Sequence, residues 1–464
     1  MPRRLASNAA IVESSLGTAD MEIPATRYAN VGGLSIAYSV GGRGGQDILV
    51  CSNWTSHVEA SWDWAPSARL MHRLATLGRV ITFDLPGNGL SDPVSLNDLP
   101  GMEQWMDCVR VVMDAADSER AVLFCEGAGG GLAIPFAATH PDRVAALILC
   151  NTFARLHRAD DYPFGIPEER RESGVEWWLE RWGTGRQLEL TAPSVADDPH
   201  EVELIARFER HSASPGVARA FFRMISEIDV RDVLQAVHVP TLVLHREGDR
   251  WIRAQHGRYL AEHIEGARYG ELPGNNHFAF YGDLEAVVDE MRSFLATLPE
   301  PHDVDRMLAA ILVTDIAGST QRAAELGDSR WRALLDEHDA ITRKQLAVFR
   351  GREIRSTGDG FLAVFDGAAR AVRCAGAIRD ALRPLDLPIR AGVHSGEIES
   401  RGGGVDGIAV HIATRVAETA AAGEVIVSQT VKDLTVGGGL AFDDRGVHAL
   451  KGVPGEWRMF AVET

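Results

Sequence analysis

Two aspartates in the C-terminal third of the chain each border an apolar run that is typical of a strand. Asp315 ends the run ILVTD and precedes a small-residue loop, and Asp359 lies in the stretch STGDGFLAVF. An Asp-Gly pair between strand-like runs predicts a hairpin, because glycine supplies the positive φ of a tight turn. Carboxylate oxygens suit Mg²⁺ or Mn²⁺, and backbone N–H groups of a Gly-Ser-Thr loop can face phosphate. Either aspartate alone would more often be a helix cap or a turn residue. The pair in this order indicates a metal-dependent polyphosphate site.

Composition bounds the remaining possibilities. The 464 residues include 47 Lys and Arg against 65 Asp and Glu, a net charge of −18. This acidic balance without basic runs argues against nucleic acid or an anionic membrane as partner. No stretch has the length and apolarity of a membrane span, and the first residues lack the apolar core of a signal peptide. Five scattered cysteines without paired spacing suit a reducing cytoplasm and predict neither zinc nor disulfides.

The order of the predicted elements indicates two domains, as the length suggests. After a loose tail over 1–25, strand-like runs alternate with helical stretches over 26–298, the pattern of a mostly parallel α/β sheet. The predicted strands are Asp47–Ser52, Val80–Asp84, Ala121–Cys125, Ala145–Cys150, Thr241–His245 and Tyr269–Leu272. An inserted helical lid is expected over about 154–237. The Pro-containing connector 299–305 then leads to a second domain over 306–464.

The second region resembles the class III nucleotide cyclase catalytic domain of soluble actinobacterial cyclases. The resemblance rests on VTDIAGST, FRGREIRSTGDGFLAVFDG, IRAGVHSGEIE, GIAVHIATRVAE, GEVIVSQTVKDL and FDDRGVHALKGV. It implies an α+β, ferredoxin-like fold in which a mixed sheet carries helices on one face. It also implies a head-to-tail homodimer with catalytic sites at the subunit interface, which converts ATP to cyclic AMP and pyrophosphate.

The resemblance assigns roles to residues on one wall of the site. Asp315 and Asp359 match the two carboxylates that hold two Mg²⁺ or Mn²⁺ ions, and Ile316 would lend its carbonyl to a metal. The triphosphate would meet the loop at a helix start, which comprises Gly318, Ser319 and Thr320.

The opposite wall falls on a predicted helix and a later loop. Arg415 matches the arginine that stabilises the transition state, and its guanidinium can hold two phosphoryl oxygens. His411 lies four residues earlier on the same helix face, where the family usually has an asparagine that orients the ribose. Lys451 matches a lysine that contacts the terminal phosphates.

The base-reading positions depart from the family pattern. ATP-using members carry a lysine and an aspartate where this chain has Arg355 and Gly404. Arg355 can still donate to a purine ring, whereas Gly404 cannot accept the exocyclic amine. Asp406, two residues on, could replace it from a flexible glycine loop. The choice between ATP and GTP therefore stays open, as does a nucleotide-binding sensor without catalysis.

The first region resembles the α/β-hydrolase fold through FDLPGNGLSD, LFCEGAGGGLAIPFAATHPDRV, PTLVLHREGDRW and LPGNNHFAF. Counted back from His140, Gly127 occupies the position of the nucleophilic serine, and glycine has no side chain to attack a carbonyl. Asp249 and His277 match the acid and base of the triad. A base with an orienting carboxylate but no nucleophile cannot perform acyl transfer by the triad route.

Three interpretations of this altered site remain open. It could be a pseudo-hydrolase that binds a small apolar ligand and regulates the second domain. It could be an esterase that uses another nucleophile or activated water, beside a degenerate cyclase domain, or it could be a structural relic. Cys125 lies near the altered position, but we expect it to be buried at a strand end, where free cysteines pack as small hydrophobes.

Overall fold

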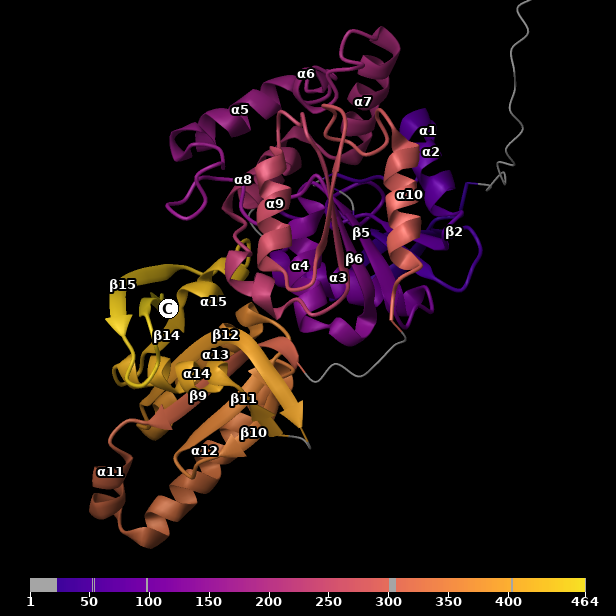
Figure 1. Cartoon of the computed structure of the whole chain (residues 1–464). Coiled ribbons are helices and arrows are strands. Elements are labelled where there is room, and N and C mark those ends of the chain that lie inside the picture. The colour runs from indigo at the N-terminus through magenta and orange to yellow at the C-terminus, as the bar shows by residue number, and fades with distance from the viewer. Residues whose placement is uncertain are drawn as a thin grey trace, which may run out of the picture.

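The computed structural model describes residues 23–51, 53, 55–96, 99–299, 306–401 and 404–463. Most of the expected tail, residues 1–22, and most of the expected connector, residues 300–305, lie outside these ranges. The described chain forms two parts, each built on its own sheet (Figure 1). No helix in these ranges is long and apolar enough to cross a membrane.

The N-terminal sheet has eight strands within the described residues, in the order β1-β2-β4-β3-β5-β6-β7-β8. β1 and β2 pair antiparallel, as do β2 and β4, and every later pair is parallel. All six predicted strands are confirmed to within one residue at either end. The strands are β1 (Arg27–Val31), β2 (Leu34–Gly41), β3 (Asp47–Cys51), β4 (Arg79–Phe83), β5 (Ala121–Glu126), β6 (Val144–Cys150), β7 (Thr241–Arg246) and β8 (Arg268–Leu272).

Helices cover both faces of this sheet, which is why its central strands are apolar throughout. One face packs against α2 (Ala65–Leu74) and α10 (Leu284–Leu295). The other packs against α3 (Met102–Ala115), α4 (Gly129–Thr139) and α9 (Ala254–His263). Alternate residues of a strand enter the two layers, as Ile48 and Leu49 do.

Helices fill the segment expected to form a lid. They are α5 (Arg171–Arg181), α6 (Leu188–Thr191), α7 (Pro199–Ser212) and α8 (Pro215–Glu227), followed by the 3₁₀ helix η3 (Arg231–Ala236). Sequence signals set two of their starts, since Asp198 and Ser214 cap α7 and α8, and each precedes a proline. Figure 1 shows α5, α6 and α7 together, beyond the sheet and away from the C-terminal part.

The C-terminal sheet runs in the order β10-β11-β9-β12-β14-β16-β15, with β13 paired to β12. Its strands are β9 (Arg306–Ile316), β10 (Arg352–Ser356), β11 (Gly360–Phe365), β12 (Ile389–Arg401), β13 (Gly404–Asp406), β14 (Val425–Ser428), β15 (Phe442–Ala449) and β16 (Glu456–Val462). The predicted hairpin is confirmed, because β10 and β11 pair antiparallel on either side of Asp359. The long helix α12 (Asp328–Val348) has Gly327 as its N-cap.

The expectation of helices on one face only is wrong. Leu308, Ala310 and Leu312 of β9 pack in the cluster that contains α13 (Ala368–Leu382) and α15 (Gln429–Leu434). The alternate residues Ala309 and Ile311 pack with α14 (Ile408–Thr419) on the opposite face. A strand that is apolar at consecutive positions is buried on both faces, which is what the run MLAAIL at the start of β9 requires.

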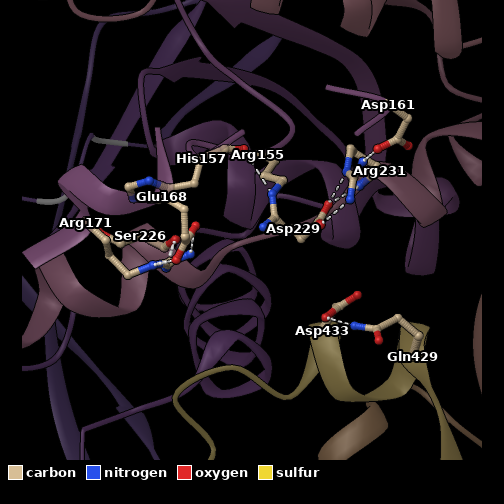
Figure 2. Close-up of polar contacts among 10 residues, drawn as sticks. All are labelled: Arg155, His157, Asp161, Glu168, Arg171, Ser226, Asp229, Arg231, Gln429 and Asp433. Atoms are coloured by element: carbon tan, nitrogen blue, oxygen red, sulfur yellow. Dashed lines mark hydrogen bonds and ion pairs between the residues drawn. The ribbon is translucent and has the colours of Figure 1, made fainter. Parts of the chain in front are cut away.

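The two parts share buried contacts. One hydrophobic cluster contains residues of α3, α4 and η3 together with residues of β9, α13 and α15. Arg370 at the start of α13 forms ion pairs with Glu103 and Asp107 of α3. Thr430 of α15 donates to Oδ2 of Asp232 at 3.0 Å, and Figure 2 shows Gln429 and Asp433 of the same helix below Asp229 and Arg231. These contacts join the lid-bearing part directly to the second sheet.

Candidate nucleotide site and altered hydrolase site

Pairing of β9 with β11 brings the two candidate metal ligands to one edge of the sheet. Asp315 lies opposite Gly360, the residue that follows Asp359. The N–H of Ile316 donates to the carbonyl of Asp359 at 2.9 Å. The Asp-Gly turn thus sets Asp359 next to the end of β9, as the hairpin pattern predicts. Asp315, Ile316 and Asp359 are neighbours in the fold, although 44 positions separate the two aspartates in the sequence.

The loop after β9 leads into α11 (Ser319–Leu326). Gly318 precedes the helix with φ of 71°, a left-handed conformation that glycine adopts without strain. The Ser319 hydroxyl donates to Oδ2 of Asp359 at 2.7 Å, which ties the helix start to the second carboxylate. Thr320 is exposed one residue further on. The helix N-terminus therefore lies beside the aspartates, where its free N–H groups suit a phosphate.

An arginine that the sequence reasoning missed also lies at this edge. Arg390 of β12 is the direct neighbour of Asp315, and its guanidinium forms an ion pair with Oδ2 of Asp315 at 2.5 Å. Both side chains are more than a third exposed. Since β9 and β12 are 75 positions apart at this contact, only the register of the sheet reveals it.

The opposite wall does not close over these aspartates within one protomer. His411 is exposed on α14, and Arg415 pairs with Glu418 on the same helix at 2.5 Å. Among the hydrogen bonds and ion pairs of the described residues, none joins either side chain to Asp315 or Asp359.

The remaining candidate residues lie at exposed positions. Arg355 is on the outer strand β10, and Lys451 is in the turn after β15. Gly404 begins the short strand β13, and Asp406 ends it with an exposed side chain. None of these residues forms a hydrogen bond or ion pair with the aspartates in the described part of the chain.

The donor set fits hard divalent cations. Two carboxylates and the Ile316 carbonyl offer only oxygen, the ligand type that Mg²⁺ and Mn²⁺ prefer. Within the described ranges, no cluster of three or more His, Cys, Asp or Glu side chains could bind a metal unaided.

In the N-terminal part, the acid and base of the altered triad remain in contact. His277 Nδ1 lies 2.8 Å from Oδ2 of Asp249, and both side chains are fully buried. The other ring nitrogen, Nε2, is buried and has no hydrogen-bond partner among the residues that the structure describes. It faces Gly127, since a Cβ atom built on that glycine would lie 2.8 Å from Nε2. The ring occupies space that a larger residue at 127 would need.

The backbone around Gly127 retains the shape of a nucleophile elbow. Gly127 has φ of 50° between β5 and α4. In such an elbow, the N–H of the next residue stabilises the oxyanion. Here the N–H of Ala128 donates to Oδ1 of Asn53 at 3.1 Å. At this elbow, position 127 therefore has no side-chain nucleophile, and the N–H of Ala128 is already bonded to Asn53.

The comparisons with known proteins agree with the division into two sheets. The family model for the adenylate and guanylate cyclase catalytic domain matches residues 305–464. This segment is a class III nucleotide cyclase domain. A putative adenylate cyclase 3 from Rhizobium meliloti (strain 1021) is 30% identical over 159 residues, which are 32% of this chain and 27% of that protein. The likeness thus spans about a quarter of that relative.

The part that precedes the cyclase domain has an α/β-hydrolase fold. The model described as serine aminopeptidase, S33, matches residues 65–283. A pimeloyl-[acyl-carrier protein] methyl ester esterase from Nitrosospira multiformis is 26% identical over 243 residues, which are 51% of this chain and 89% of that protein. The crystal structure of bromoperoxidase from Bacillus anthracis covers 59% of this chain and 100% of its own, with 19% identity and a TM-score of 0.50, a likeness of fold alone.

Cys125 is a poor replacement nucleophile for this hydrolase fold. It is fully buried at the end of β5, and burial together with the neighbouring Cys51 raises the pKa of its thiol well above the ordinary value. A thiol that cannot ionise is neither a nucleophile nor a metal ligand. All five cysteines are free and buried in the structure.

A cavity lies between the hydrolase core and the helices that follow β6. Its volume is about 100 Å³. The core contributes Asp84 and Glu126 from the ends of β4 and β5, and α7 contributes Phe208 and Glu209. The cavity therefore opens next to the altered triad.

Proposed function

We propose that the cyclase domain converts ATP to 3′,5′-cyclic AMP and pyrophosphate with Mg²⁺ or Mn²⁺ at the interface of a homodimer. The observation that carries the proposal is the placement of Asp315 and Asp359 on paired strands, beside the start of α11. We take residues 306–464 as this domain and 26–298 as the hydrolase-like domain, with 299–305 as the linker. We expect the protein to act in the cytoplasm, where five free cysteines stay reduced.

The reaction is an intramolecular phosphoryl transfer, in which the ribose 3′-oxygen attacks the α-phosphorus and pyrophosphate leaves. Asp315, Asp359 and the Ile316 carbonyl would hold the metal ions, which neutralise phosphate charge and lower the pKa of the attacking hydroxyl. Gly318, Ser319 and Thr320 would bind phosphate oxygens at the helix start. The chain itself mainly orients the substrate and supplies positive charge where negative charge develops.

The second subunit would complete the site. Arg415 would leave its contact with Glu418 and face the α-phosphate, and His411 would donate to the ribose. Lys451 would contact the terminal phosphates as a point charge. These three side chains are solvent-accessible and belong to a wall that makes no polar contact with the aspartates of its own protomer.

Base selection would depend on Arg355 and Asp406. Arg355 can donate to the purine ring, and Asp406 could accept from the adenine amine. A site that lacks one of these hydrogen bonds would discriminate weakly between ATP and GTP. We therefore expect activity with both purines, with ATP preferred.

The decisive measurement is cyclic nucleotide formation by the purified full-length protein with Mn²⁺-ATP and with Mn²⁺-GTP. We expect product with ATP and a loss of at least about a hundredfold in Asp315→Ala and in Asp359→Ala, because each removes a metal carboxylate. Product from wild-type protein no greater than from Asp315→Ala would exclude catalysis. Tight ATP binding without turnover would then favour a nucleotide-binding sensor.

A complementation experiment tests the shared site. Asp315→Ala and Arg415→Ala should each be inactive alone. Mixed in equal amounts, they should recover about a quarter of wild-type activity, because half of the dimers are mixed and one of their two sites is intact. No recovery, in a mixture shown to exchange subunits, would contradict catalysis between subunits.

We further propose that the hydrolase-like domain binds a ligand and regulates the cyclase domain instead of hydrolysing esters. The absence of a side chain at Gly127 and the bond between Asn53 and Ala128 support this role. Short p-nitrophenyl esters should not be turned over. Turnover that disappears in His277→Ala would instead support an esterase with another nucleophile or an activated water.

A further inference from the structure

The lid cavity has aromatic walls. Trp64 packs against Phe208, Phe278 and Phe280 with ring centroids 4.8–5.9 Å apart. Trp178 and Trp251 form a second pair at 4.9 Å. All six rings line the cavity. Such walls suit an apolar body, and their electron-rich faces also attract cations.

Three carboxyl groups line the same cavity, and each accepts hydrogen bonds from backbone amides. Asp84 Oδ2 accepts from the N–H groups of Val58 and Leu90 at 3.2 and 3.0 Å. Glu126 Oε1 accepts from Ala279 at 2.7 Å, and Glu209 Oε2 accepts from Gly183 at 2.7 Å.

Among the described residues that line the cavity, none is a lysine or an arginine. Burial raises the pKa of Asp84 to about 6, that of Glu209 to about 8, and that of Glu126 in the same direction. Burial is the largest cause of each shift, and it outweighs the lowering effect of Arg210 on Glu209 and of His277 on Glu126.

Other polar groups of the wall do not supply the missing positive charge. His57 lines the cavity, but burial and the nearby His211 lower the pKa of its imidazole. Its Nδ1 already accepts from the N–H of Ala60 at 3.1 Å. Gln187 is 2% exposed and presents an Oε1 atom without a hydrogen-bond partner to the cavity wall. The cavity wall thus offers carboxyl and amide oxygens as acceptors to a ligand that donates hydrogen bonds.

We propose that this cavity binds a hydrophobic amine, with its protonated nitrogen between Glu126 and Glu209 and its apolar body against the tryptophan and phenylalanine rings. The inference deepens the proposed ligand-sensing role and rests on it. An anionic acyl group would meet three carboxyls and no cation, whereas an ammonium group gains charge-assisted hydrogen bonds and contacts with ring faces. Because Gly127 supplies no nucleophile, a ligand in this cavity would be bound without being cleaved.

The test is calorimetric titration of the full-length protein with 4-phenylbutylamine, with 4-phenyl-1-butanol as a neutral match and 4-phenylbutyrate as an anionic one. We expect the amine to bind about ten- to a hundredfold more tightly than the alcohol, the span typical of a hydrogen bond to a charged group. The butyrate should not bind measurably. Equal affinity for amine and alcohol, or tighter binding of the butyrate, would overturn the proposal, and so would no binding of any probe.

A second readout follows from protonation and needs no variant. A carboxyl that is protonated in the free protein must ionise to pair with the ammonium, so binding should release up to about one proton per ligand near pH 7. Titrations in buffers with different ionisation enthalpies measure that proton. Proton uptake, or no proton exchange between pH 6 and 8, would contradict the pairing.

Variants locate the ammonium site. Glu209→Gln preserves the size of the side chain and an acceptor for Gly183, so it should fold while losing most of the preference for the amine. Glu203→Gln on the same helix is the control, because Glu203 is exposed and pairs with Arg210. An unchanged preference in both Glu209→Gln and Glu126→Gln would overturn the assignment. Because Asp315→Ala should still bind the amine, loss of cyclase activity and loss of ligand binding are separate results.

Discussion

At residue 127, the backbone has the conformation of a nucleophile elbow, but the surrounding side chains leave little space for a Cβ atom. The positive φ is that of an elbow, but a Cβ atom would lie 2.7 Å from Asn53 Nδ2 and 2.8 Å from His277 Nε2. Both neighbours would have to move to admit any side chain. The site is therefore packed for glycine.

Gly127→Ser should not create an esterase. The serine would crowd His277, and the N–H of Ala128 would stay bonded to Asn53. We expect turnover of p-nitrophenyl acetate no greater than in the wild type, and a loss of about 1–3 kcal/mol in the free energy of unfolding, the usual cost of overpacking. Urea denaturation measures the second effect. Gly45→Ser is the control, because a Cβ atom at that position meets nothing within 4 Å. Strong esterase activity in Gly127→Ser would show that the N–H of Ala128 is free to bind an oxyanion.

Ser319→Ala should weaken catalysis through Asp359. Its hydroxyl donates to the Asp359 carboxylate at 2.7 Å, and a hydrogen bond to a charged group contributes roughly 1.5–3 kcal/mol. We expect kcat/KM for Mn²⁺-ATP to fall about tenfold or more, with a higher Mn²⁺ requirement. Ser329→Ala, at an exposed position of α12, should leave both values unchanged. Equal kinetics in the two variants would mean that Ser319 does not position Asp359.

At the scale of elements, α14 lies close to the second sheet because β12 has glycines at the two positions, 392 and 396, that face this helix. A Cβ on Gly392 would lie 2.2 Å from the backbone nitrogen of Ala417, and one on Gly396 would lie 2.8 Å from Cβ of Ala409. The helix that carries His411 and Arg415 is thus positioned by two glycines of a strand. Because of this close packing, α14 covers one face of the sheet while α13 and α15 cover the other, whereas helices were expected on one face only.

Gly392→Ala should displace α14. The new methyl group meets backbone, which cannot rotate away, so we expect a loss of about 1–3 kcal/mol in the free energy of unfolding. Cyclic nucleotide formation should fall by more than that of a stability-matched variant, because Arg415 moves with the helix. Gly376→Ala on α13 is the control, since a Cβ there meets only the end of Arg379 and should stabilise the helix by about 0.4–1 kcal/mol. Wild-type activity in Gly392→Ala would show that the position of α14 is not critical.

At the scale of the whole molecule, the two domains meet through apolar and acidic surfaces. Asp433 of the cyclase helix α15 accepts a hydrogen bond from Gln429 and lies below Asp229 of the hydrolase domain in Figure 2. Asp232 of the hydrolase domain is also close enough to Asp433 to act on its charge. Burial, Asp229 and Asp232 raise the pKa of Asp433 to about 7 against the partial compensation of Gln429 and Lys432. Asp229 is held by Arg155 and Arg231, whereas Asp232 accepts from Thr430 at 3.0 Å.

The raised pKa of Asp433 makes the junction sensitive to pH. The folded protein retains a proton that the unfolded chain loses near pH 4, so this contribution to stability is complete below pH 4 and is lost as the pH rises through about 7. We expect Asp433→Asn to show a smaller fall of the unfolding midpoint between pH 5 and 8 than the wild type. Asp380→Asn, at an exposed position, should follow the wild-type profile. Parallel profiles for all three proteins would exclude titration at the junction.

Much of the architecture is determined by the sequence alone, because its signals are local. Apolar runs predict the strands of the first sheet, the Asp-Gly turn predicts the hairpin that brings Asp359 to Asp315, and glycine at position 127 removes the nucleophile. Each of these features depends on backbone preferences and side-chain periodicity within a few residues.

Only the tertiary structure decides which distant groups meet. Asn53 bonds to Ala128 and Arg390 pairs with Asp315, each across 75 positions of sequence. The carboxyl-lined cavity, the position of α14 and the acidic junction likewise depend on strand register and on packing between separate elements. Such contacts have no local signature, because burial and register are properties of the assembled chain.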